Sequence, residues 1–350
     1  MRPALVLQTL LLACVLLNAP AQSQTLHPDA VVRSVLHDAR GNYWFGTAEH
    51  GVYRFDGDSL TRFTKDDRLV SNQVRSLVED RAGRVWFEGA SGISTYDGHA
   101  ITTLVDRDHT AKSAWELNPD DLWFKGDEIV GFNRAEGSPG VYRYDGEALR
   151  YHAFPFANPS GNNGSVTGID QRRPDRVWIA TYGGVIGFDG DSFTLIDDAT
   201  LGHTDETGYF HARVVFEDSQ ERLWIGNNGI GVILREGDTT INFTQARGLS
   251  RRGRRSGGQT DVPRLGDAPP GQPTLHRVFA ISEDAEGNIW FGTVEEGVWR
   301  FDGETLRQFT DEDGLETSIV TSIYTDRNGT TWFGGEGVFT FDGTRFERQF

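Results

Sequence analysis

One stretch decides the fold: Asp284-Ala-Glu-Gly-Asn-Ile-Trp-Phe-Gly-Thr-Val-Glu-Glu-Gly-Val-Trp-Arg-Phe-Asp-Gly303. Nearly the same sequence occurs near the N-terminus as Asp38-Ala-Arg-Gly-Asn-Tyr-Trp-Phe-Gly-Thr-Ala-Glu-His-Gly-Val-Tyr-Arg-Phe-Asp-Gly57. Each copy contains an Asp-led turn, a short strand, a Gly-containing loop, a second short strand and an Asp-Gly turn. The chain is therefore predicted to repeat one β-unit.

The tryptophan inside this unit recurs along the chain and marks seven copies. The marks are Trp44, Trp86, Trp123, Trp178, Trp224, Trp290 and Trp332. Each mark is followed by a strand and then by a turn, and the turns are Asp56-Gly57, Asp97-Gly98, Asp145-Gly146, Asp189-Gly190, Glu236-Gly237, Asp302-Gly303 and Asp342-Gly343. Both series give the same number of copies.

A full copy has room for four strands, which in the first copy are predicted at residues 31–37, 43–47, 51–55 and 59–64. A small antiparallel sheet of this kind cannot cover both of its faces, and units of this period stack around an axis as propeller blades. The prediction is an all-β chain: a single seven-bladed β-propeller of four-stranded antiparallel blades over residues 22–350. The marker tryptophans are then expected to pack between blades.

An aspartate stands six residues before five of the marker tryptophans. These residues are Asp38, Asp80, Asp218, Asp284 and Asp326. Aspartates in this position are predicted to form Asx-type turns. Because they belong to different blades, they are too far apart to share an ion, and no metal site is predicted.

The N-terminus has the pattern of a secretory signal peptide. A single positive charge precedes an apolar run, and Ala19-Pro-Ala21 supplies a cleavage pattern, so residues 1–21 are predicted to be removed from an exported protein. Two alternatives stay open, an uncleaved membrane anchor and a lipoprotein signal at Cys14. Cys14 is the only cysteine, so the mature chain is expected to have no disulfide, and no later segment resembles a membrane span.

Composition excludes several classes of function. The formal net charge is −17, which argues against nucleic-acid binding and against docking on anionic lipid, since both require a basic surface. Signatures of metalloproteases, serine hydrolases and phosphate-binding loops are missing from the sequence. No cofactor and no catalytic residue are predicted, and the favoured class is a module that binds a ligand or a protein.

The repeats resemble a known family. Val74-Arg-Ser-Leu-Val-Glu-Asp80, Ile319-Val-Thr-Ser-Ile-Tyr-Thr-Asp326 and Asp313-Gly-Leu315 look like the two-component regulator propeller repeat. The resemblance implies the periplasmic sensor part of a histidine kinase or hybrid regulator, with oligosaccharides as frequent ligands. No kinase or regulator segment follows the seventh copy in this sequence, so we expect no phosphotransfer by the chain itself. The implied partners are an oligosaccharide or anionic small ligand, and a membrane-bound kinase or another protein.

Propeller geometry predicts where a ligand binds. Arg33, Arg75 and Arg213 lie at matching positions, five residues before the repeat aspartate, near one end of three innermost strands. Three guanidiniums at a channel mouth would suit an anionic or carboxylate-bearing ligand, whereas the alternative is that each pairs with a neighbouring acid. Further candidates on the same face, suited to sugar hydroxyls, are His50, Lys125, Tyr182, Tyr209, Asn227 and Glu295.

Two rival functions stay open. Some seven-bladed propellers are lyases, for which the candidates here are His50, His109, His203 and His211. The other rival is a scaffold that binds a protein. The copies disagree most in the insert after Phe124 and in the Arg-rich segment 247–272, and function is expected where they disagree. The ring is predicted to close by packing of residues 344–350, or by an added strand from residues 24–29.

Overall fold

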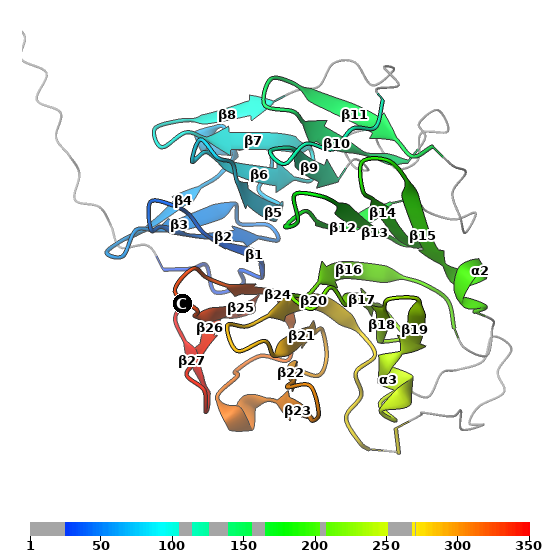
Figure 1. The fold of residues 1–350 in the computed structure, drawn as a ribbon. Helices are drawn as coiled ribbons and strands as arrows, with labels where there is room; N and C mark the ends of the chain where they lie inside the picture. Colours follow the sequence, from blue (N-terminus) through cyan, green and yellow to red (C-terminus); the bar gives the residue numbers. More distant parts are fainter. Residues whose placement is uncertain are drawn as a thin grey trace, which may run out of the picture.

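Seven antiparallel sheets are arranged in a ring (Figure 1). The computed structural model describes residues 25–104, 114–125, 139–155, 165–203, 208–250, 268–269 and 271–350. Each sheet is one blade, and its strands follow one another outward in sequence order. The predicted fold class, an all-β seven-bladed propeller, is confirmed. The predicted signal peptide, Cys14, His109 and most of the two segments in which the copies disagree lie outside the described residues.

The strands of the first four blades agree with the spacing of the repeats. They are β1 (Val32–His37), β2 (Tyr43–Thr47), β3 (Val52–Phe55) and β4 (Leu60–Phe63); β5 (Val74–Glu79), β6 (Val85–Gly89), β7 (Gly92–Tyr96) and β8 (Ile101–Leu104); β9 (Leu122–Lys125), β10 (Gly140–Tyr144) and β11 (Leu149–Ala153); and β12 (Val166–Asp170), β13 (Val177–Thr181), β14 (Gly184–Phe188) and β15 (Phe193–Asp197). Within the described residues the third blade has three strands, because its innermost position is not occupied by a strand.

The last three blades each have four strands. They are β16 (Ala212–Glu217), β17 (Leu223–Asn227), β18 (Val232–Glu236) and β19 (Thr239–Asn242); β20 (Val278–Glu283), β21 (Ile289–Thr293), β22 (Val298–Phe301) and β23 (Leu306–Phe309); and β24 (Val320–Thr325), β25 (Thr331–Gly335), β26 (Gly337–Phe341) and β27 (Phe346–Arg348). Short helical turns follow four outer strands: η1 (Lys65–Asp67), α2 (Asp198–Leu201), α3 (Phe243–Ala246) and η2 (Asp311–Asp313). No helix of the described residues is long and apolar enough to cross a membrane.

The marker tryptophans pack between blades, as predicted. Trp44 is fully buried, and its ring lies 5.4 Å from Phe87 and 5.3 Å from Tyr96, both in the second blade. Trp224 makes the same kind of contact with Phe291 of the sixth blade at 5.5 Å. Each tryptophan therefore fills the space between its own blade and the next, where aromatic burial stabilises the ring of blades.

The repeat aspartates do more than form turns. Asp38 Oδ1 accepts the backbone N–H groups of Arg40 and Asn42, which is the predicted Asx geometry, while Oδ2 accepts the indole N–H of Trp44 at 2.8 Å. The same indole bond occurs in four other blades, at 2.7 to 2.9 Å, from Trp86, Trp224, Trp290 and Trp332. Each of these five aspartates thus fixes a turn and satisfies a tryptophan N–H that would otherwise be buried without a partner.

The ring closes where the seventh blade meets the first. All four strands of the seventh blade come from the C-terminal part of the chain, and the Phe350 ring packs 5.3 Å from Phe45 and 5.1 Å from Phe55. Residues 25–29 form no strand, so the alternative closure by an added N-terminal strand is not seen in that segment. Side-chain packing, together with an isolated backbone bridge between Val31 and Glu336, closes the ring.

Candidate functional site

Each of the six described innermost strands carries one β-bulge at the same place. In β1, Val32 pairs with Thr47 and Ser34 pairs with Gly46, so Arg33 is an extra residue in the register between them. Corresponding irregularities occur in β5, β12, β16, β20 and β24. The residues at these positions are Arg33, Arg75, Thr167, Arg213, Phe279 and Thr321, named below the bulge ring. A bulge redirects a side chain at a sheet edge, here towards the channel.

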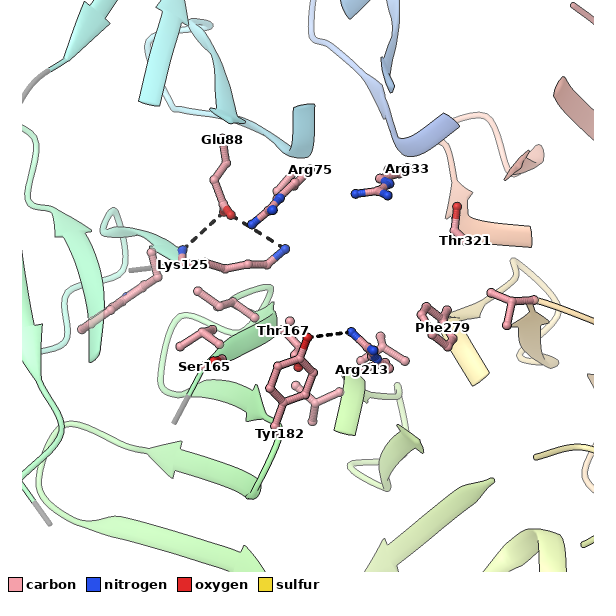
Figure 2. A pocket seen from close by; sticks show the side chains of 18 of the residues that line it. Arg33, Arg75, Glu88, Lys125, Ser165, Thr167, Tyr182, Arg213, Phe279 and Thr321 are labelled. Carbon is pink, nitrogen blue, oxygen red and sulfur yellow. Dashed lines mark hydrogen bonds and ion pairs between the residues drawn. The ribbon is translucent and has the colours of Figure 1, made fainter. Parts of the chain in front are cut away.

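A cavity of about 570 Å³ lies at the centre of the propeller, and every residue of the bulge ring lines it. Figure 2 shows Arg33, Arg75 and Arg213 extending into this cavity from β1, β5 and β16. The size is within the usual range of small-molecule sites. The structure thus brings the three predicted arginines to one cavity, while their role in binding stays a prediction.

Arg213 is held between two aromatic rings. Its guanidinium carbon lies 4.9 Å from the Tyr182 ring and 4.8 Å from the Phe279 ring, and Nη1 donates to the Tyr182 hydroxyl at 3.1 Å (Figure 2). Stacking of this kind orients a guanidinium without neutralising it. Just before β16, burial and then the charge of Arg213 lower the pKa of His211, whose ring packs edge-on against Tyr182 at 4.5 Å. Arg213 is thus a positioned cation.

The cavity reaches the third blade, whose described strands are β9, β10 and β11. There β9 borders the cavity directly, and side chains from neighbouring blades bond to its backbone. Gln171 accepts the Trp123 N–H at 2.7 Å and donates to the Trp123 carbonyl at 3.1 Å. Glu88 accepts the Lys125 N–H at 3.3 Å. Two side chains therefore replace part of the hydrogen bonding that a strand would supply.

The charge of the cavity is opposite to that of the protein. Among the described residues that line it, the cations are Arg33, Arg75, Lys125 and Arg213, and the single acid is Glu88. The whole chain has a formal net charge of −17. A cationic cavity in an acidic protein attracts anions to this one place, because its low-dielectric walls focus the field.

The other predicted residues divide into two groups. Lys125 and Tyr182 line the cavity together with the three arginines. The remaining four, which do not line it, are His50, Tyr209, Asn227 and Glu295. His50 stacks on His27 at 4.0 Å, and Tyr209 is 52% exposed. Asn227 is fully buried and accepts the His211 N–H, while Glu295 pairs with Arg277 and with His276 Nε2.

The histidines considered for a lyase are not gathered at the cavity. His203 lies outside it and bonds to Asp198 at 3.0 Å, His50 stacks on His27, and His211 is covered by Tyr182 and Asn227. Within the described part of the chain, no histidine lines the cavity, and no group of three metal-ligating side chains is present.

Sequence reasoning missed Glu88, Gln171, Thr167, Phe279 and Thr321. The last three had a usable signal, because they occupy the register of the three arginines in other copies. Glu88 had one too, since it stands where the repeat has glycine in Trp-Phe-Gly-Thr. Gln171 had none, because its contact depends on the absence of a strand.

Comparison with known proteins places the repeats in a family. Residues 272–295 and 314–337, in the sixth and seventh copies, match the model of the two component regulator propeller. This match confirms the resemblance drawn from the repeat sequence. No curated protein sequence matches the chain.

Solved structures share the fold. The extracellular domain assigned to the hybrid two component system BT3049 from B. thetaiotaomicron is 20% identical with a TM-score of 0.64, over 90% of this chain and 39% of that one. Virginiamycin B lyase from Staphylococcus aureus, solved with quinupristin, is 15% identical with a TM-score of 0.60, over 89% and 94% of the two chains. YCF48 from Cyanidioschyzon merolae is 10% identical with a TM-score of 0.56, over 89% and 96%. This chain thus spans about two-fifths of the first structure, and the likeness shows the fold alone.

Proposed function

We propose that this seven-bladed propeller, which carries two component regulator propeller repeats, is an exported ligand-binding module of the sensor type. Its ligand is anionic, a carboxylate-bearing saccharide or a similar small molecule, and binds in the central cavity. One observation carries the proposal: three arginines from three blades occupy equivalent bulges and line the same cavity.

The chemistry of the lining supports a carboxylate. Arginine presents its N–H donors in a planar fork that matches a carboxylate, and hydrogen bonds between such charged partners are stronger than neutral ones. Tyr182 and Phe279 add aromatic surface, and Ser165, Thr167 and Thr321 add hydroxyl groups. Apolar surface combined with a few directed polar groups is typical of sites that bind small polar molecules such as sugars.

Export and signalling are supported by separate observations. The N-terminal residues 1–21 have the composition of a signal peptide, and the solved structures with a similar fold include extracellular domains of two component systems. A sensor without phosphotransfer activity needs a partner that carries the signal, and we propose a membrane-bound kinase or another protein for that role.

Calorimetric titration tests the ligand class. The probe is digalacturonate, and the neutral comparison is galactobiose of the same linkage. We expect saturable binding of the acid only, weakened by added salt. Arg33→Gln and Arg213→Gln should each weaken binding about ten-fold, since each removes one charged hydrogen-bond donor pair. Arg235→Gln, which removes a half-buried arginine whose Nε donates to the Gly237 carbonyl outside the cavity, serves as the matched control and should bind like the wild type.

Equal binding of the neutral and acidic disaccharides, or full affinity in both cavity variants, would contradict the proposal. The same samples also distinguish binding from turnover. A lyase acting on polygalacturonate would generate an unsaturated product with new ultraviolet absorbance, whereas a binding module leaves the absorbance unchanged. Growth of that absorbance, lost in His211→Ala, would establish the enzymatic alternative.

A further inference from the structure

Glu88 occupies a position that is glycine in four other blades, namely Gly46, Gly226, Gly292 and Gly334. Those glycines have no room for a side chain. A Cβ atom on Gly46 would lie 2.4 Å from Ser34 Oγ and 2.7 Å from a methyl group of Val74, which belongs to the innermost strand of the next blade. Next to Glu88 no such strand is present among the described residues, and Glu88 lines the cavity together with Lys125 of β9. Glu88 therefore replaces the glycine of the other copies at a place where a side chain can reach a ligand in the cavity.

The carboxylate of Glu88 is buried and yet faces the cavity. Its side chain is 4% exposed, and the residue belongs to the cavity lining. Oε2 accepts the Lys125 N–H at 3.3 Å, and Oε1 lies 3.8 Å from Lys125 Nζ, beyond hydrogen-bond distance (Figure 2). An ionised carboxylate can accept about four hydrogen bonds. Glu88 thus retains acceptor capacity at the wall of a cavity that is otherwise cationic.

We infer that Glu88 determines the specificity of this site. The ligand presents its carboxylate to the arginines of the bulge ring and a hydroxyl group, or another hydrogen-bond donor, to Glu88. A second carboxylate at that end would meet a buried like charge, which is a strong means of rejecting the wrong ligand. The preferred ligand presents a hydroxyl group rather than a second carboxylate to Glu88, and an acid of the same size with a second carboxylate at that end binds more weakly. This inference rests on the proposed binding of an anion in the cavity.

A purely structural role for Glu88 makes a different prediction. If Glu88 only supports β9, a glutamine in its place would keep the acceptor for the Lys125 N–H and change nothing in ligand preference. If Glu88 selects the ligand, the same substitution removes the repulsion of a second carboxylate. Glu88→Gln therefore separates the two roles while leaving the hydrogen bond to β9 in place.

The test uses galactonate and galactarate, two open-chain acids that differ only in a terminal hydroxymethyl group or a second carboxylate. Calorimetry should show that the wild type binds galactonate about ten-fold more tightly than galactarate. In Glu88→Gln the ratio should fall to about one or reverse. The matched control is Glu79→Gln, an acid of the same blade that is paired with Arg327 and does not line the cavity, and it should keep the wild-type ratio.

An unchanged ratio in a folded Glu88→Gln variant, or a wild type that prefers galactarate, would overturn the inference while leaving anion binding intact. If neither acid binds to the wild type, or if Arg213→Gln binds both as well as the wild type, the proposed function itself fails and the inference fails with it. Thermal melts of all variants establish that each is folded before the titrations are compared.

Discussion

Two parts of the propeller hold different residues at the same position of the strand that contains the marker tryptophan. In blades one, five, six and seven, called here the regular sector, the second residue after the marker tryptophan is glycine. In blades two, three and four, the irregular sector, the same position holds Glu88, Lys125 and Ala180. The glycines contact the innermost strand of the next blade, whereas Glu88 and Lys125 line the cavity. The position thus serves packing between blades where it holds glycine, and it contributes to the cavity where Glu88 and Lys125 replace glycine.

Exchanging the residues of the two sectors should give the largest effect. Gly46→Glu places a buried carboxylate where even a Cβ atom is 2.4 Å from Ser34 Oγ, so we expect a loss of at least about 3 kcal/mol in unfolding free energy, or no folding. Glu88→Gly should cost about 1 kcal/mol, the usual penalty of a strand glycine. Urea denaturation measures both. Similar losses in the two variants would remove the distinction between the sectors.

The second largest effect is expected for the repeat aspartate of the regular sector. Asp218 is buried and accepts the Trp224 indole N–H at 2.8 Å and Arg222 Nε at 2.6 Å. Asp218→Ala leaves both donors buried, and we expect a loss of about 3 kcal/mol. Arg172, half exposed, stands at the same place before Trp178, and Arg172→Ala should cost about 1 kcal/mol. Denaturant midpoints compare the two, and equal losses would mean that the repeat aspartate has no special structural role.

Acid should weaken the blades that contain these aspartates. Burial alone would raise the pKa of Asp38, but hydrogen bonds from Trp44 and Asn42 outweigh it and lower the pKa below its ordinary value of 3.8. The pKa values of Asp80 and Asp326 are lowered in the same way. A carboxyl group with a lowered folded pKa contributes stability above its unfolded pKa, and that stability is lost as the pH falls through the folded value.

We therefore expect the melting temperature to fall as the pH is lowered below about 4, with a smaller fall in Asp38→Asn than in the wild type. Scanning calorimetry between pH 6 and pH 3, both chosen to bracket that range, measures the difference. A variant that loses stability as steeply as the wild type would show that Asp38 does not contribute to acid unfolding.

The smallest effect belongs to the irregular sector and concerns the ligand rather than the fold. Tyr182→Phe removes the hydroxyl that holds Arg213 Nη1 at 3.1 Å while keeping the stacked ring. We expect digalacturonate to bind about three-fold more weakly, with an unfolding free energy within about 0.5 kcal/mol of the wild type. A loss of stability without a change in affinity would assign the Tyr182 hydroxyl to packing.

The fold could be predicted from the sequence because the same β-unit occurs in it seven times. Seven tryptophans and seven turns fixed the number of blades, and the predicted strands of the first copy agree with β1 to β4 within one residue at each end. The period of the repeat and the register of residues within it are local properties of the chain, so both can be determined from the sequence without knowledge of long-range contacts. The third blade was harder, because its innermost strand is missing among the described residues.

The site could be predicted only in part. The arginines were found because they repeat in register, and the bulges then direct them into one cavity. Asn227 and Glu295 do not line the cavity, because Asn227 ends β17 and is buried, while Glu295 pairs with Arg277; the sequence reveals neither contact. Contacts between blades, such as that of Gln171 with β9, depend on packing far along the chain and leave no local signal.

Hydrogen–deuterium exchange with and without digalacturonate tests most directly whether the ligand binds to the bulge ring. The account predicts slowed exchange in β1, β5, β12 and β16 around the bulges and in β9, with no change in the outer strands β4, β19, β23 and β27. Protection confined to those outer strands, or the same exchange with and without the acid, would contradict it.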